Sequence, residues 1–317
     1  MIKSADVAER AGVSRATVSQ ILNGRDARFS EETKQRVRQA AVDLGYQPSL
    51  AARTLARGSS DVVIALIPNT TFGDNLQDLF EGMTEELAEH GLTLVLRLAT
   101  PTTSSLDRLV STLRPAAVHA LTPFTSAERE LLTERGVATV DPSTQGHADY
   151  NEAIGSLQAR TLIDRGHTRL AFAHLHDARQ DPFGTARERG VRDRCREAGL
   201  PDPTVLRIGI DIDEAAAALD ELGSPGFAVA CYNDDVATAL LSAATLRGWR
   251  VPEDLALIGM DHTPLGQVTV PPLTTISYDR AATARSSTAH VLAVLGLRDP
   301  ENTPAPPEFT IVPGSTA

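Results

Sequence analysis

Cysteine and long apolar runs are both scarce in this chain. Its 317 residues include only two cysteines, Cys195 and Cys231. Two thiols so far apart in sequence indicate neither a disulfide framework nor a zinc site. No apolar run reaches the 18 residues of a membrane span, and Asp6, Glu9 and Arg10 interrupt the start, where a secretion signal would be apolar. We therefore expect a cytoplasmic protein with no metal and no other cofactor.

Positive charge is scarce beyond the first 60 residues. Residues 1–60 contain 10 Lys or Arg against 6 Asp or Glu, whereas the rest of the chain contains 20 against 35. Basic side chains gain affinity for DNA because they release counterions from its phosphates. The basic start is thus the candidate nucleic-acid interface, and the acidic remainder, which DNA should repel, must have another task. The length favours a small head followed by larger lobes.

Two short helical patterns meet at Gly12 in the basic head. Gly12 permits a tight turn, Ser14 can cap the second helix, and a third helix is expected between Ser30 and Gly45. The inward positions of the first two helices are apolar at helical spacing: Val7, Ala8, Ala11, Val18, Ile21 and Leu22. This order is typical of a helix-turn-helix unit. The alternative is a plain three-helix bundle whose polar face is merely solvated.

The outward face of the second helix is polar and suggests how the head would contact DNA. Arg15 can donate two hydrogen bonds to guanine, Ala16 can touch a thymine methyl, and Gln20 can pair with adenine. Short polar side chains suit phosphates, which position a protein without specifying sequence. The residues of this second kind are Ser14, Thr17, Ser19 and Asn23.

After the polar linker 57–60 the pattern changes to short apolar runs that alternate with helical segments. Strands are expected at 62–67, 92–98, 228–232 and 255–259, with a helix at 76–90. Strands that alternate with helices indicate parallel sheets in a doubly wound α/β arrangement. Ligands in such sheets bind at the carboxyl ends of the strands.

Several short blocks of the head match a known pattern: Asp6-Val7-Ala8, Ala11-Gly12-Val13-Ser14, Thr17-Val18-Ser19, Leu22-Asn23 and Leu44-Gly45-Tyr46-x-Pro48. In these blocks the head resembles the lactose-repressor (LacI/GalR) family of bacterial transcription regulators. The resemblance implies a helix-turn-helix DNA-binding domain at 1–48 and a hinge helix with its linker at 49–60. It also makes Leu55 the candidate wedge that unstacks a minor-groove step; alternatively, Leu55 packs on its own head. Many members have arginine where this chain has Gln20, so guanine readout should be absent there.

The resemblance extends into the rest of the chain through blocks at 162–171, 187–190, 233–234, 251–254, 259–261, 272–276 and 312–316. It implies an all-α helix-turn-helix head followed, at 61–317, by an effector-binding and dimerisation domain. That domain would be a periplasmic-binding-protein-like α/β body of two doubly wound parallel-sheet lobes. The chain would cross between the lobes near Asp149, Tyr278 and Pro306.

Family positions also suggest an effector site. Arg187, Asn233 and Asp261 match residues that bind the effector in relatives, and together they offer a cation, an amide and a carboxylate for a hydroxyl-rich ligand. Tyr232 is larger than the usual residue and could narrow the pocket. Asp141, Asp181 and Phe183 either face the cleft, as in relatives, or are ordinary loop residues.

Departures from the family pattern leave the effector's identity open. Tyr150 replaces a frequent asparagine, Ala239 and Ala284 replace glycines, Asn75 and Leu76 replace aromatic residues, and Pro313 replaces an arginine. A sugar is the expectation by family frequency, and another metabolite is the alternative. His174 and His176 point the same way on a strand and could bind a metal, but no third ligand has suitable spacing.

Together these patterns predict a transcriptional regulator, most simply a repressor, that acts as a homodimer on a pseudo-palindromic double-stranded DNA operator. A small molecule bound between the lobes would control it. A solute-binding module without a role in gene control is the alternative, and the basic head argues against it. An enzyme would need a general acid/base pair in the cleft, and the sequence offers only a binding set.

Overall fold

The structure is a computed structural model that describes residues 2–22, 26–46, 58–100, 102–143, 150–176, 181–302, 304 and 308–317. Asn23, Leu55, most of the predicted hinge helix and the crossovers predicted near Asp149 and Pro306 lie outside these residues. Among the helices described, none combines the length and the apolar character that crossing a bilayer requires.

The head consists of three helices: α1 (Ser4–Ala11), α2 (Arg15–Leu22) and α3 (Glu31–Leu44). Gly12 ends α1 in the left-handed region, with φ 64° and ψ 38°, a conformation that costs glycine least. The Oγ of Ser14 accepts a hydrogen bond from the backbone N–H of Thr17 at 3.0 Å, and Ser30 caps α3 in the same way. The turn at Gly12 and the cap at Ser14 are therefore confirmed, whereas α1 is capped by Lys3 and not by Ser4, the cap that the sequence predicts.

A small apolar core holds the three helices together. Its buried members are Val7, Ala8, Ala11, Val18, Ile21, Val37, Ala40 and Ala41. The inward positions predicted on the first two helices are all in this core or, for Leu22, packed against it. Because Val18, Ile21 and Leu22 of α2 are used in this way, the opposite, mostly polar face of α2 is left for solvent or a partner.

The first lobe is built on a sheet with strand order β2-β1-β3-β4. Its strands are β1 (Val62–Ile67), β2 (Thr93–Leu98), β3 (Ala117–Ala120) and β4 (Ala138–Val140), and β3 runs parallel to both β1 and β4. The helices between them are α5 (Asp74–Glu89), α6 (Ser104–Leu113) and α7 (Ser126–Glu134). All six residues of β1 are buried, as a central parallel strand requires.

The second lobe repeats this plan with the strand order β6-β5-β7-β8, and all of its strand pairs are parallel. Its strands are β5 (Leu170–Leu175), β6 (Thr204–Ile208), β7 (Phe227–Cys231) and β8 (Leu255–Ile258). Its helices are α8 (Tyr150–Asp164), α9 (Gly184–Glu197), α10 (Ile212–Leu222), α11 (Asp234–Arg247) and the short α12 (Pro264–Gln267). Separate apolar cores lie on the two faces of the sheet, so the lobe is doubly wound.

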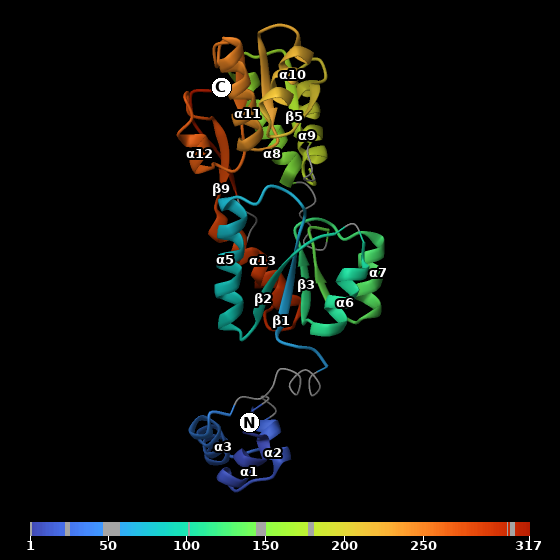
Figure 1. Ribbon diagram of the computed structural model, residues 1–317, viewed down its shortest axis with the longest axis vertical. Helices are drawn as coiled ribbons and strands as arrows, with labels where there is room; N and C mark the ends of the chain where they lie inside the picture. The colour runs from blue at the N-terminus through green and yellow to red at the C-terminus, as the bar shows by residue number, and fades with distance from the viewer. Residues whose placement is uncertain are drawn as a thin grey trace. The chain divides into compact units, whose positions relative to one another are not determined.

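Near its end the chain returns to the first lobe. Strand β9 (Thr275–Tyr278) leads into α13 (Arg280–Val294), which packs beside α5 although about 200 residues separate them in sequence (Figure 1). A Cβ atom on Gly82 would lie only 2.8 Å from the Cβ of Ala284, so the glycine on α5 makes room for the alanine on α13. After the 3-10 turn Pro300–Asn302, strand β10 (Phe309–Val312) pairs antiparallel with β9.

Candidate functional sites

The outward face of α2 presents the side chains predicted to contact DNA. Ser14, Arg15, Ala16 and Ser19 are exposed, and Thr17 and Gln20 are half-buried. The N-terminal turn of a helix leaves backbone N–H groups without intrahelical partners, and such a turn suits contact with phosphate oxygens. The structure thus places six of the predicted DNA-binding residues on one surface of the head.

Gln20 is not free on this surface. Its Oε1 accepts a hydrogen bond from a guanidinium nitrogen of Arg28, and Arg28 also lies over the ring of Phe29 at 5.0 Å. Pairing of Gln20 with adenine would use the same oxygen together with the amide nitrogen. Gln20 must therefore share or release Arg28 when it reads a base, a constraint that the sequence did not reveal.

A cavity of about 190 Å³ lies between the two lobes. The first lobe contributes α5, Leu121 after β3 and one face of α13; the second contributes the starts of α8 and α9 and the end of β8, and the paired strands β9 and β10 complete the lining. Three of the predicted effector residues line it: Phe183, Arg187 and Asp261. The cavity therefore lies near the carboxyl ends of parallel strands, as expected for a doubly wound sheet.

Arg187 is the buried cation of this cavity, with only 6% of its surface exposed. Its Nε donates to Oδ1 of Asn151 at 3.0 Å, and its Nη1 donates to the carbonyl oxygen of Tyr232. The guanidinium also lies 5.7 Å from the ring centre of Phe183 and 5.0 Å from that of Tyr232, close enough for cation–π attraction. These contacts fix the group's orientation before any ligand arrives.

Asp261 supplies the carboxylate. Its backbone has φ 102°, an unfavourable conformation for a residue with a Cβ, and such strain often occurs at functional sites. Arg280 holds the turn by donating to the carbonyl oxygen of Asp261 at 2.8 Å. Burial raises the pKa of the Asp261 carboxyl, and the positive charge of Arg187 opposes that rise.

Asp181 supports the cavity wall without lining it. Its carboxylate contacts Nδ1 of His174 at 2.5 Å and accepts the backbone N–H of Gly184, also at 2.5 Å. The second ring nitrogen of His174 lies 2.8 Å from Glu188, so both nitrogens face carboxylates. Within the described residues no group of three or more acidic, His or Cys side chains forms a metal cluster. Asp181 and His174 instead fix the start of α9, which carries Phe183 and Arg187.

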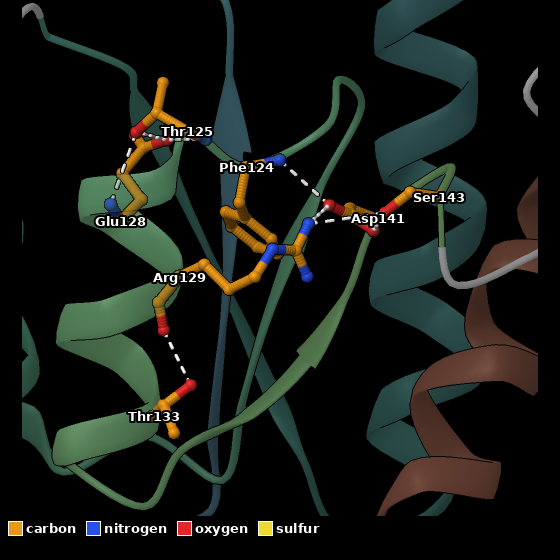
Figure 2. A network of polar contacts seen from close by, with 7 residues as sticks. All are labelled: Phe124, Thr125, Glu128, Arg129, Thr133, Asp141 and Ser143. Atoms are coloured by element: carbon orange, nitrogen blue, oxygen red, sulfur yellow. Dashed lines mark hydrogen bonds and ion pairs between the residues drawn. The ribbon is translucent and has the colours of Figure 1, made fainter.

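Asp141 also lies outside the cavity lining. Its fully buried carboxylate accepts hydrogen bonds from the backbone N–H of Phe124 and from Arg129, both at 2.8 Å, and from Ser143 at 2.6 Å (Figure 2). The network ties the loop after β3 to the loop after β4. With the carboxylate occupied in this way, the geometry favours the structural interpretation that the sequence left open.

Tyr232 and Asn233 join the lobes rather than line the cavity. The Tyr232 hydroxyl lies 3.1 Å from Oγ1 of Thr70, and the Asn233 amide donates to Oγ1 of Thr71 at 2.9 Å. Asn233 also caps α11 by accepting the N–H of Val236. Both side chains are almost fully buried, and burial raises the pKa of Tyr232 to about 12. Both therefore hold the two lobes against each other.

Asp234, which the sequence interpretation assigned no role, anchors the Asp261 turn. Its buried carboxylate accepts hydrogen bonds from the backbone N–H of Thr263 at 2.7 Å and from the Thr275 hydroxyl at 2.6 Å. Burial outweighs these bonds and raises the pKa of Asp234 to about 7. The turn that carries Asp261 is therefore held by a carboxyl group that titrates near neutral pH.

We expect this group to make the protein less stable as the pH rises. The pKa of Asp234 is higher in the folded state than its ordinary value of 3.8. The stability that this group contributes is therefore fully present below about pH 4 and is lost as the pH rises from there to about 7. In Asp234→Asn the amide oxygen can still accept the N–H of Thr263 and the amide nitrogen can donate to the Thr275 hydroxyl, and neither group titrates. Urea unfolding at pH 5, 6, 7 and 8 should show a smaller loss of stability with pH in the variant than in the wild type. The exposed Asp213→Asn on α10 is the control, and equal pH profiles for Asp234→Asn and wild type would contradict the assignment.

The sequence interpretation missed several cavity residues. Asn151 supplies an amide next to Tyr150, where the sequence indicated that an asparagine had been lost. Polar positions on α13 line the cavity at helical spacing, and that spacing was the available signal. The residues missed are Leu79, Leu121, Asn151, Ile154, Met260, Tyr278, Thr283, Ser286, Ser287 and Phe309.

Comparison with known proteins agrees with both parts of the molecule. Residues 5–49 match the family of bacterial regulatory proteins called the lacI family, and residues 159–317 match the periplasmic binding protein-like domain. The HTH-type transcriptional regulator MalR of Streptomyces coelicolor is 32% identical over 341 residues, which cover 99% of this chain and 96% of MalR. The chain belongs to the LacI family.

Other relatives and structures fit this placement. The HTH-type transcriptional repressor PurR of Vibrio vulnificus is 29% identical to this LacI-family chain and covers 86% of it and 85% of its own length. A lac repressor dimer bound to operator and the anti-inducer ONPF superposes with a TM-score of 0.75 at 20% identity, over 99% and 98% of the two chains. A CelR–cellobiose complex gives 0.68 at 23%, over the whole of both chains. The predicted fold is confirmed, and the chain is a DNA-binding transcriptional regulator with an effector-binding body.

Proposed function

We propose that this LacI-family regulator is a repressor that binds a pseudo-palindromic operator as a homodimer and responds to a small molecule bound between its lobes. One observation carries the proposal: a single chain combines an exposed polar face on α2 with a preorganised cation and carboxylate in a cavity of the body. The described residues that line the cavity include one arginine and one aspartate, whereas glycoside hydrolysis generally uses two carboxyl groups. We therefore propose binding and no catalysis.

The dimer is supported by apolar surface on the body. Strand β2 is an edge of its sheet, and its Leu96 and Leu98 are exposed. Leu265, Val268 and Val270, on and after α12, form a second run of exposed apolar side chains, of which Val270 is 89% exposed. Exposed edges and apolar runs of this kind favour association. A second copy of the chain is the partner we propose, because a small head reads few bases and two heads read two half-sites.

The effector would act through the angle between the lobes. A ligand held by Arg187 and Asp261 of the second lobe would also face Leu79 on α5 and Ser286 on α13 of the first lobe, so binding should favour one arrangement of the two lobes. In a dimer such a change alters the spacing of the heads and thereby their joint affinity for the operator. Reciprocity then requires that operator DNA change the affinity for the effector by the same factor.

Selection from random DNA followed by gel-shift titration tests this function. The full-length chain should enrich a sequence with two related half-sites and bind it as two chains per site. Addition of the effector should change the affinity for that site. If the selection enriches no sequence, or if the bound site holds a single chain, the proposal is wrong.

Leu55→Ala should weaken operator binding by about tenfold and reduce the bend in the DNA. An apolar side chain inserted between base pairs kinks the duplex, and alanine is too short to do so. Gel-shift titration and the mobility of circularly permuted operator fragments measure the two effects. Thermal unfolding of the body should not change. If the variant binds and bends DNA like the wild type, Leu55 is not the wedge.

A further inference from the structure

The cavity lining also restricts the chemistry of the effector. Building on the proposed function, we infer that the effector is an uncharged molecule of about one six-membered ring, with hydrogen-bonding groups around its edge and apolar faces. Size, charge and the distribution of polar groups each lead to a part of this inference.

The size of the cavity favours a small ligand. Its volume is about 190 Å³, which compares with roughly 150 Å³ for an engineered cavity that binds benzene. One substituted ring fills such a space, and a second linked ring would extend beyond it. The cavity therefore suits a single ring better than a disaccharide.

The charges of the lining favour an uncharged ligand. Among the described residues, Arg187 and Asp261 are the only charged ones that line the cavity. The Nε and Nη1 atoms of Arg187 already donate to Asn151 and Tyr232, so two of its five N–H groups are not available to a phosphate. Asp261 would repel an anion, and Arg187 would repel a cation.

Polar groups reach the cavity from both lobes. Asn151, Arg187 and Asp261 come from the second lobe, and Ser286 and Ser287 come from α13, which packs on the first. The described residues provide no hydrogen-bond partner for the hydroxyls of these two serines, which lie on one helix face with Thr283 one turn earlier. A ligand that pairs with the polar groups of the second lobe and with the hydroxyls of α13 needs hydrogen-bond donors and acceptors on two of its own edges.

Apolar groups occupy the remaining sides. Leu76 and Leu79 lie one turn apart on α5, so both side chains face the same way. The aromatic rings of Tyr150, Tyr278 and Phe309 form a cluster in which the Phe309 centroid lies 6.0 Å from each of the other two. These surfaces suit the C–H faces of a sugar or cyclitol ring, and equally the flat faces of a free nucleobase.

A ligand panel tests the inference with the full-length chain. The uncharged arm contains hexoses, 6-deoxyhexoses, inositol and the free pyrimidine bases uracil and cytosine, so that it also distinguishes a sugar from a base. The matched arms contain glucose 6-phosphate, the nucleoside monophosphates, maltose and cellobiose. At least one compound of the uncharged arm should raise the melting temperature, because a ligand stabilises the state that binds it. Calorimetry should show that its phosphate or its disaccharide binds at least about tenfold more weakly.

The serines on α13 provide a test within the protein. Ser286→Ala and Ser287→Ala should each weaken binding of the identified compound by about tenfold, since each leaves one polar group of the ligand unpaired. Ser242→Ala, at an exposed position on α11, is the matched control and should bind like the wild type.

Several outcomes would overturn the inference. They are tighter binding of a phosphate or a disaccharide, no stabilisation by any uncharged ring compound, and wild-type affinity in both α13 variants. Operator selection with the same preparation keeps the two proposals separate. A chain that selects an operator but binds a sugar phosphate refutes only the inference about the effector, whereas a chain that binds the ring but selects no DNA refutes the proposed function.

Discussion

Gly155→Ala should lower the free energy of unfolding of the body by about 1–3 kcal/mol, the usual cost of inserting a methyl group into a close-packed site, and should weaken effector binding as well. A Cβ atom at Gly155 on α8 would lie 1.9 Å from the carbonyl oxygen of Arg187 on α9. The obstacle is backbone, so relief requires the two helices to move apart. Because Arg187 carries the cation of the cavity, the same movement displaces its guanidinium.

The contact is reciprocal, which makes a second variant informative. A Cβ atom at Gly190 on α9 would lie 2.1 Å from the carbonyl oxygen of Glu152 on α8. Gly190→Ala lies one helical turn from Arg187, so it should cost similar stability and disturb the ligand less. Urea unfolding and effector titration measure the two effects.

Ala153→Ser, at an exposed position of α8, is the control for a one-atom addition to the same helix. It should leave both stability and effector affinity unchanged. If Gly155→Ala is as stable as the wild type, α8 and α9 do not approach each other as closely as the structure shows. If it is destabilised but binds the effector normally, Arg187 is not positioned by this crossing.

Asp261→Asn should weaken effector binding by about 10- to 100-fold, the range that corresponds to loss of hydrogen bonds to a charged group. Asparagine tolerates positive φ about as well as aspartate, so the substitution removes the charge without adding backbone strain. Asp261→Ala removes the acceptor as well and should abolish the response. In both variants the affinity for operator without effector should remain that of the wild type, because the head is unchanged.

Gel-shift titration with increasing effector gives the dose response of each variant. Asp213→Asn, on the exposed side of α10, is the control and should respond like the wild type. An unchanged dose response in Asp261→Ala would remove Asp261 from the effector site. Loss of DNA binding without effector would show instead that Asp261 acts on the fold.

Local patterns predicted the helical head and the parallel sheets, and the family resemblance predicted the two lobes. In the head, Gly12 forms its turn and Ser14 and Ser30 cap their helices through residues next to them in sequence. The local sequence is therefore sufficient to predict these features. In the body, strands such as 62–67 appear as apolar runs because both faces of a parallel sheet are covered. The resemblance predicted a crossover near Tyr278, but the packing of α13 beside α5 was not predicted, because it depends on residues about 200 positions away.

The candidate site was predicted only in part, and the reason is that one residue type can serve two purposes. Asp141 and Asn233 lie near strand ends, where ligands bind, but their polar atoms are used to join loops and lobes. Phe183, Arg187 and Asp261 lie equally near strand ends and do line the cavity. Only the positions of their partners distinguish the two groups, and those partners, such as Phe124 and Thr71, are distant in sequence.

Tyr278 and Phe309 are paired neighbours in the antiparallel strands β9 and β10, and both line the cavity. Strand β9 leads the chain from the second lobe back to α13, so a ligand there would contact a strand that connects the lobes. Under the proposed change in the angle between the lobes, a rotation near these strands would be small at the ligand and larger at the far ends of the lobes. A ligand that contacts the connecting strands is therefore well placed to bias that angle.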